Sequence, residues 1–173
     1  HDHVRNLRAA VRALRGEADA ILHCGDLCAP FIVPILKKFA GPVHAVFGNN
    51  DADRYRLQLQ AAKTDNVQLH GETFFAELGG KVFAVHHFDD VARHLAASGD
   101  FDFVCFGHNH KYEIGQSGSC RLINPGAILG YQPSGAEDVE PTFVVLDTES
   151  DEIVTWRIEG DEASPRPTGR PAD

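Results

Sequence analysis

The stretch Phe101–His110, which reads FDFVCFGHNH, contains the pattern that decides the fold. Its first six residues are apolar except for Asp102, as expected of a short buried strand, and Gly107-His108-Asn109-His110 follows at once. The same arrangement occurs three more times, in AILHCGD at 20–26, VHAVFGNND at 43–51 and KVFAVHH at 81–87. Ligands of open α/β sheets bind beyond the carboxyl ends of the strands, so the four polar clusters are expected to converge in space.

The rest of the chain predicts helices between these strands and a run of strands after them. Apolar periodicity and capping residues predict four helices: Val4–Leu14 with Asp2 near its N-cap, 31–39 with Pro34 in its first turn, a segment after Asp53, and 89–98. Strands are predicted at 73–78 and 81–85, joined by Gly79-Gly80 as a hairpin, at 120–123, and as an antiparallel pair at 142–146 and 153–158.

This mixed order predicts an α/β (α+β) fold, an αββα sandwich of two mixed sheets flanked by helices. Residues 1–159 are predicted to form a single domain whose site lies at the C-terminal ends of the strands. Residues 160–173 are mostly Pro, Gly, Asp and Arg, with little to bury, so they are predicted to be a disordered C-terminal tail.

Composition limits the classes of function. The 173 residues contain no apolar run of the roughly 20 residues that a membrane-spanning helix needs. A formal net charge of −9 argues against binding duplex nucleic acid but not against a small phosphate-ester substrate. The four cysteines favour reduced thiols, of which Cys24 and Cys105 adjoin apolar runs, and a cytoplasmic location; a Cys24–Cys28 redox or zinc pair stays open.

The polar clusters at the strand ends contain a set of candidate metal ligands. They are His1, Asp26, Asn49, His86, His108 and His110. Neutral imidazole with carboxylate and amide oxygen suits manganese, iron, zinc, cobalt or nickel. Six groups are more than one four-coordinate ion needs. A carboxylate can bridge two ions, and two neighbouring metals form a clamp for displacement at phosphorus.

Four blocks in this order resemble the signature of the calcineurin-like metallophosphoesterases: Gly25-Asp26, Gly48-Asn49-Asn50-Asp51, His86, and Gly107-His108-Asn109-His110. The compact size and Asn124-Pro125-Gly126 are similar to the small bacterial and archaeal phosphodiesterase branch, to which the retromer subunit Vps29 is related.

The resemblance implies two divalent ions, manganese first, with nickel, zinc, iron or cobalt as alternatives. It implies that Asp26 bridges them, that His1 and His110 bind the first ion, and that Asn49, His86 and His108 bind the second. It also implies a first aspartate two positions upstream of His1, on a first strand that precedes residue 1.

Two departures from the family pattern concern the reaction. Where many members have a histidine that contacts the phosphate and protonates the leaving group, this chain has Asn50, which makes Asn50 the catalytic candidate by resemblance. An amide can donate a hydrogen bond but gives up no proton near pH 7, which favours diesters with good leaving groups. His87-Phe88 stands where relatives often carry Gly-His, and His87 is interpreted either as a substrate-side residue or as a surface residue.

The sequence therefore predicts a two-metal phosphoesterase, a phosphodiesterase that uses a metal-bridging hydroxide as nucleophile. A phosphomonoesterase or nucleotide phosphatase, with His87 as the acid, and a Vps29-like scaffold without activity are the alternatives. The expected partner is a small phosphate ester, with no membrane, and a homo-oligomer stays open.

The other polar residues near the blocks have structural interpretations. His3, His44, His70 and His94 are expected to be structural or solvated, and His23 to be hydrogen-bonded to the backbone. Asp51 is expected to cap the following helix and hold its loop.

Overall fold

The computed structural model describes residues 1–166. Four α-helices lie in this range, at Val4–Ala13 (α1), Val33–Leu36 (α2), Arg54–Ala61 (α3) and Asp89–Ser98 (α4), and a 3-10 turn at Pro30–Ile32 precedes α2. The first eight strands are Ile21–His23 (β1), Val43–Ala45 (β2), Val67–Leu69 (β3), Thr73–Leu78 (β4), Lys81–His86 (β5), Phe103–Cys105 (β6), Tyr112–Ser117 (β7) and Cys120–Pro125 (β8). The others are Tyr131–Gln132 (β9), Glu137–Asp138 (β10), Thr142–Leu146 (β11), Ile153–Glu159 (β12) and Glu162–Pro165 (β13).

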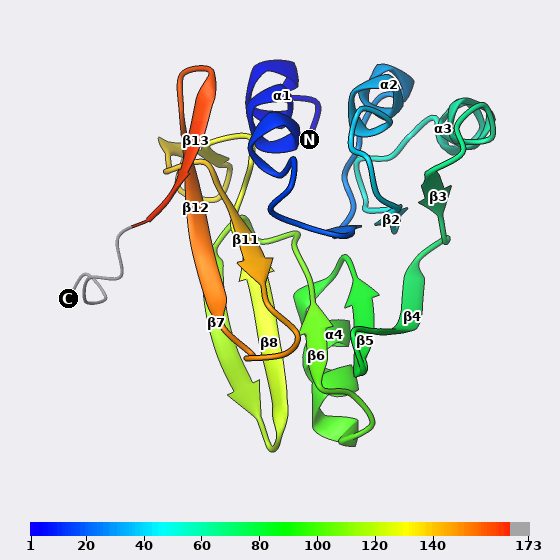
Figure 1. The fold of residues 1–173 in the computed structure, drawn as a ribbon. Helices are drawn as coiled ribbons and strands as arrows, with labels where there is room; N and C mark the ends of the chain where they lie inside the picture. Colours follow the sequence, from blue (N-terminus) through cyan, green and yellow to red (C-terminus); the bar gives the residue numbers. More distant parts are fainter. Residues whose placement is uncertain (167–173) are drawn as a thin grey trace.

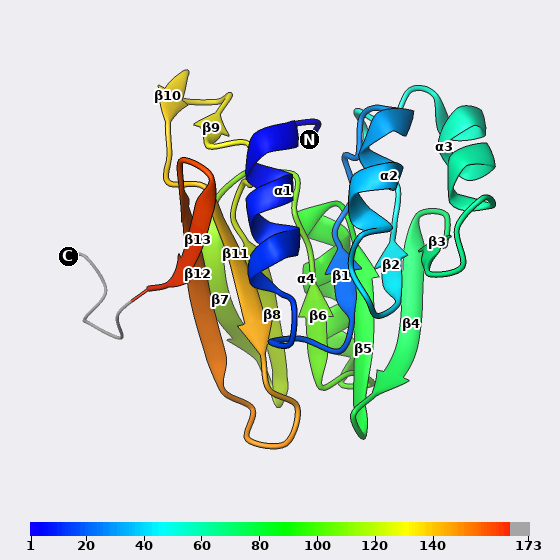
Figure 2. The ribbon, with the colours of Figure 1, turned by 45° about the horizontal axis from the view of Figure 1, so that its top comes forward.

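Most of the strands form two layers. The first layer consists of two three-stranded sheets. β1, β2 and β3 make a parallel sheet in that order, and β11, β12 and β13 make an antiparallel one. The second layer is the five-stranded sheet β4-β5-β6-β8-β7, in which β5, β6 and β8 are parallel and the two edge strands are antiparallel. Figure 2 shows α1 and α2 on one side of the molecule and α4 behind β5 and β6 on the other. The predicted α/β fold, with layered sheets flanked by helices, is confirmed (Figure 1), and the five-stranded sheet is the one that mixes parallel and antiparallel strands.

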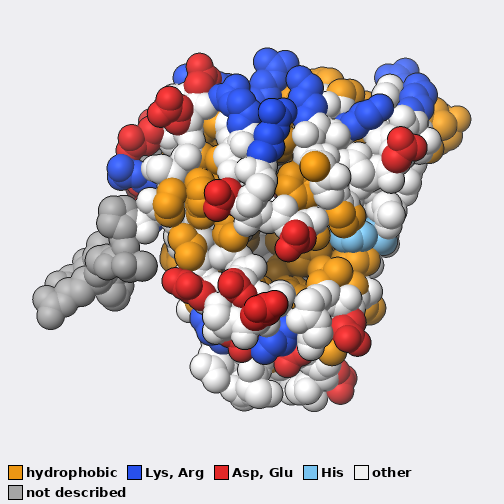
Figure 3. Space-filling model, viewed as in Figure 1, with side chains coloured by type: hydrophobic (Ala, Val, Ile, Leu, Met, Phe, Trp, Pro, Cys, Tyr) orange, Lys and Arg blue, Asp and Glu red, His pale blue; other side chains and the backbone are white. Residues whose placement is uncertain are grey.

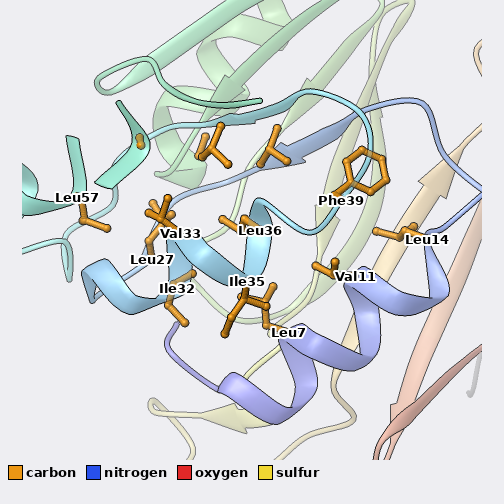
Figure 4. Close-up of a cluster of buried hydrophobic side chains, with 14 of the residues drawn as sticks. Leu7, Val11, Leu14, Leu27, Ile32, Val33, Ile35, Leu36, Phe39 and Leu57 are labelled. Carbon is orange, nitrogen blue, oxygen red and sulfur yellow. The ribbon is translucent and has the colours of Figure 1, made fainter. Parts of the chain in front are cut away.

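Each interface between layers has its own apolar cluster. Leu7, Val11 and Leu14 lie on one face of α1 because they recur at helical spacing, and they pack on α2 (Figure 4). A second cluster, with Val85 and Cys105, lies between the sheets, and a third, with Ala84 and Val104, lies beneath α4. Successive residues of β5 and β6 alternate between these two clusters, as pleated strands require.

Several predicted elements are confirmed. α4 has the predicted bounds, with Asp89 and Asp90 in its first turn. The hairpin of β4 and β5 pairs Leu78 with Lys81 across the two glycines. The antiparallel pair of β11 and β12 is also as expected, and β12 extends one residue further, to Glu159.

Three expectations need correction. The N-cap of α1 is His3, whose ring accepts a hydrogen bond from the Asn6 N–H, and not Asp2. The helix expected over 31–39 is a 3-10 turn followed by the single turn of α2, with Pro34 in the first turn as required. The predicted tail contains β13, which pairs with β12 and packs on α1; 167–173 of the predicted tail lie outside the described residues.

A pair of histidines lies where the β1–β3 sheet meets β4. His44 Nδ1 and His70 Nε2 are 2.9 Å apart, and both rings pack on Phe74. Figure 3 shows histidine side chains in pale blue at the surface on this side of the molecule. Burial lowers the pKa of His44, and burial together with His44 lowers the pKa of His70.

Acidification is expected to destabilise the fold through this pair. Folding lowers the pKa values of both histidines below the ordinary 6.5. At a pH between the pKa of the folded state and that of the unfolded state, the unfolded chain therefore binds more protons than the folded chain. The free energy of unfolding should therefore decrease as the pH falls below about 6.5. Urea denaturation at pH 7.5 and 5.5, with chelator, should show a smaller decrease for a His44→Asn/His70→Asn variant than for the parent. His94→Asn, on the exposed side of α4, is the control and should keep the parent's decrease. An unchanged decrease in the double variant would contradict the prediction.

No helix among residues 1–166 is long and apolar enough to cross a membrane.

Candidate metal centre

The polar clusters that follow β1, β2, β5 and β6 converge at one end of the sheets, as the sequence predicted. The loops that carry them have a tightly constrained backbone. Asp26, His108 and His110 have φ values of 58°, 67° and 58°, in the left-handed region that non-glycine residues rarely adopt. Gly25 also has a positive φ, and a Cβ atom there would lie 2.6 Å from His87 Nδ1 and 2.9 Å from Gly48 N. A side chain at position 25 would therefore clash with the loops that follow β2 and β5, and glycine allows these loops to approach closely.

Three of the predicted ligands form a first group of donor atoms. His1, Asp26 and His110 each offer one ligand atom, and these atoms lie within 4.8 Å of one another. His1 Nε2 is 2.8 Å from His110 Nε2 and 3.5 Å from Asp26 Oδ2. These separations are close to the ~3 Å between neighbouring ligand atoms around an ion with metal–nitrogen bonds of about 2.1 Å.

A second group of donor atoms also reaches the Asp26 carboxylate. Asn49 Oδ1 is 2.9 Å from His108 Nδ1 and 2.9 Å from His87 Nε2. His87 Nε2 is also 3.5 Å from Asp26 Oδ2. Asp26 is thus common to both groups, the position that a bridging carboxylate occupies in a two-metal site.

The histidine in this second group is His87 and not His86, which the resemblance implies. His86 Nδ1 instead accepts a hydrogen bond from the Phe88 N–H, and within residues 1–166 the ring has no hydrogen bond to Asp26, Asn49 or His108. The reason is the alternation of β5. Ala84 faces α4 and Val85 faces the space between the sheets, so His86 follows Ala84 and His87 follows Val85. Alternation along KVFAVHH was the signal in the sequence that could have identified His87.

The hydrogen bonds of His87 indicate that this group is built for a cation. Its Nδ1 lies 2.8 Å from the Cys24 carbonyl oxygen, which can only accept, so Nδ1 carries the proton and Nε2 of the neutral ring presents a lone pair. That lone pair faces Asn49 Oδ1 and Asp26 Oδ2, which are acceptors as well. Burial lowers the pKa of His87, which opposes a second proton on the ring. A metal ion could accept a lone pair from each of these three atoms.

His110 is oriented in the same way. Its Nδ1 lies 2.7 Å from the Tyr131 carbonyl oxygen in β9, so the lone pair of Nε2 is directed toward His1. Backbone carbonyls that fix the tautomer of a histidine are a common feature of metal sites. The donor set therefore fits divalent transition metals in both groups.

Asn50 and Asp51 contact the same loops. The backbone N–H of Asn50 donates to Asp26 Oδ1 at 2.8 Å and its side-chain amide donates to Oδ2 at 2.9 Å. The buried Asp51 carboxylate accepts from the N–H groups of Asp26, Cys28 and Gly48, so it holds two loops together as expected. The helix cap is made by Asp53 instead, which accepts from the Arg56 N–H. His23 accepts from the Gly25 N–H, as predicted.

A buried amide network supports the loop that carries His108 and His110. Asn124, which is fully buried, donates to Asn109 Oδ1 at 2.8 Å and to the Gly107 carbonyl at 3.2 Å. Gln132 donates to the Asn109 carbonyl at 3.0 Å. These hydrogen bonds come from β8 and β9. They fix the loop in which His108 and His110 have positive φ values.

Replacing Asn124 by alanine is expected to weaken metal binding about 10- to 100-fold, the usual effect of losing a group that orients ligands. The matched control is Asn66→Ala, since Asn66 also donates to backbone carbonyls, those of Phe39 and Gly41, but far along the chain from the histidine loop. Both variants should have lower melting temperatures. Only Asn124→Ala should bind Mn²⁺ more weakly in a calorimetric titration, and equal affinities would show that Asn124 supports the fold alone.

Comparison with known proteins identifies the family to which this fold belongs. The family model of the calcineurin-like phosphoesterase superfamily domain matches residues 1–151. The phosphodiesterase MJ0936 of Methanocaldococcus jannaschii is 29% identical over 155 residues, which cover 88% of this chain and 90% of that protein. A solved structure of a novel archaeal phosphodiesterase has a TM-score of 0.81 at 26% identity and covers 91% of this chain and 94% of that one. Vps29 of Entamoeba histolytica in complex with zinc has the same fold, with a TM-score of 0.64 at 22% identity over 90% of this chain and 84% of that one.

Fold, donor groups and relatives together define a metal-dependent phosphoric ester hydrolase. The chain belongs to the calcineurin-like phosphoesterase superfamily.

Proposed function

We propose that the protein is a phosphodiesterase that depends on two divalent metal ions. The observation that supports this most directly is the pair of donor groups that share Asp26. The first ion would be held by His1, Asp26 and His110. The second would be held by Asp26, Asn49, His87 and His108, with His87 in place of His86. When bound, the two ions supply an activated water and neutralise charge on the phosphoryl group.

The residues of the chain perform the remaining tasks. Cys24 O and Tyr131 O keep the lone pairs of His87 and His110 directed into the site. Asn50 holds both carboxylate oxygens of Asp26, which fixes the plane of the shared ligand. Because an amide supplies no proton at neutral pH, Asn50 would assist departure of the leaving group through hydrogen bonding alone. This favours diesters with good leaving groups over alkyl monoesters, in agreement with the phosphodiesterase relatives.

Hydrolysis of matched esters tests the proposal. The protein would be loaded with Mn²⁺, the metal we favour for this mixed nitrogen and oxygen donor set, and assayed with bis(p-nitrophenyl) phosphate and p-nitrophenyl phosphate. A higher kcat/KM for the diester, with two metal ions per chain by elemental analysis, is the expected result. A higher kcat/KM for the monoester would establish the phosphomonoesterase alternative, and no hydrolysis of either by fully loaded protein would exclude both.

The cellular setting that we propose is the cytoplasm, with a small phosphate ester as substrate. All four cysteines are free, and burial raises the pKa of Cys105 to about 12 and that of Cys24 well above its usual value. Such thiols are unreactive and fit a reducing compartment.

A further inference from the structure

A polar hollow adjoins the second donor group. It has a volume of about 440 Å³ and is open to solvent. One wall is the loop His108–Lys111, another is the segment 132–134 after β9, and the third is Asp89 at the start of α4. A volume of this order accommodates a group the size of a sugar or nucleoside. Because His108 is part of both the hollow and the donor group, a group that occupies the hollow lies directly beside the proposed metal site.

The charges that line the hollow are one carboxylate and one ammonium, and they differ in their partners. Asp89 Oδ2 accepts a hydrogen bond from Asn109 Nδ2, and the carboxylate lies in the first turn of α4, where the helix dipole stabilises a negative charge. Lys111 is exposed and forms no salt bridge or side-chain hydrogen bond with any residue in 1–166. The hollow therefore holds one carboxylate whose oxygen is hydrogen-bonded to Asn109 and one ammonium without a side-chain partner among residues 1–166.

We propose that this hollow binds the second ester substituent of the substrate and that Lys111 selects substituents that carry a negative charge. The inference rests on the proposed phosphodiesterase activity and adds the class of diester. The carboxylate or second phosphate of such a substituent would pair with the Lys111 ammonium while the phosphodiester lies at the two donor groups. Because the whole chain has a formal net charge of −9, an anionic substituent needs a local positive group, and Lys111 would supply it.

Three p-nitrophenyl diesters that share a leaving group test this proposal. Their second substituents are 2-carboxyethyl, propyl and choline, which are negative, neutral and positive. For the parent, kcat/KM should be about two- to fivefold higher for the carboxyethyl ester than for the propyl ester, the effect of one solvent-exposed ion pair. The choline ester should be the poorest. Lys111→Gln should bring the ratio of carboxyethyl to propyl ester to about one, and Lys111→Glu should invert it.

Two controls separate this subsite from other effects. Lys63→Gln removes an exposed lysine that follows α3, and it should keep the parent's ratio. Because Lys111 follows His110 directly, the Mn²⁺ affinity of Lys111→Gln would be measured as well. A loss of affinity that parallels the loss of kcat/KM would overturn the proposal in favour of an effect through His110. Hydrolysis of all three esters by the parent at equal rates would overturn the subsite alone, whereas hydrolysis of none would overturn the proposed function.

Discussion

Replacement of Asp26 by asparagine is expected to reduce kcat/KM for a phosphodiester by at least about 10³-fold while the fold is retained. Asp26 is the one residue common to both donor groups, so its loss affects both proposed metal positions at once. Asparagine has nearly the same shape but lacks the negative charge that two cations require between them. One hydrogen bond from Asn50 is lost as well, which should cost only ~1 kcal/mol of stability.

The measurement combines steady-state kinetics, elemental analysis and thermal denaturation. Asp53→Asn is the matched control, because Asp53 caps α3 and asparagine is an equally good N-cap. That variant should keep the parent's kcat/KM and melting temperature. If Asp26→Asn bound two metal ions per chain and turned over at a rate near that of the parent, the shared-ligand arrangement would be wrong.

The second large effect distinguishes two adjacent histidines. His87→Ala is expected to lower the metal content from two ions to one per chain and to reduce hydrolysis by at least about 10²-fold, because it removes one donor of the second group. His86→Ala should keep both ions, since that ring accepts from the Phe88 N–H and has no hydrogen bond to either donor group within residues 1–166. Its main effect should be on stability, because His86 is buried.

The two variants serve as each other's control. They remove the same side chain from neighbouring positions, so differences in metal content cannot come from the chemistry of the substitution. Elemental analysis and hydrolysis of bis(p-nitrophenyl) phosphate decide the outcome. Two ions in His87→Ala and one in His86→Ala would restore the ligand set that the sequence alone suggested.

The sequence predicted those elements whose local sequence pattern favours the same structure as their packing in the fold. The β4–β5 hairpin and α4 are examples, because Gly79-Gly80 and the acidic first turn determine them locally. β13 was missed because its residues bury little by themselves and become ordered by pairing with β12 and packing on α1. The helix at 31–39 was overestimated because the apolar run 31–36 divides into a 3-10 turn and the single turn of α2, which apolar periodicity alone does not distinguish from one helix.

The sequence predicted that the polar clusters meet, whereas the roles of their residues as metal ligands stay a prediction. Four strand ends identify Asp26, Asn49, His108 and His110 as neighbours, whatever their exact orientation. The choice between two consecutive histidines depends on which face of β5 each occupies, and the block pattern alone carries no information about faces. Hydrogen bonds across the chain, such as that from Asn124 to Asn109, link residues 15 positions apart and have no local signature.

The alternation of β5 also determines which changes in chain length the protein can tolerate. Val85 and His87 face the same side only because one residue separates them, and β5 is held in register by β4 on one side and β6 on the other. Substitution of His86 leaves this spacing intact, whereas deletion of one residue between Val85 and His87 would turn the remaining histidine toward α4. Natural variation at this strand should therefore consist of exchanges at position 86 and not of insertions or deletions.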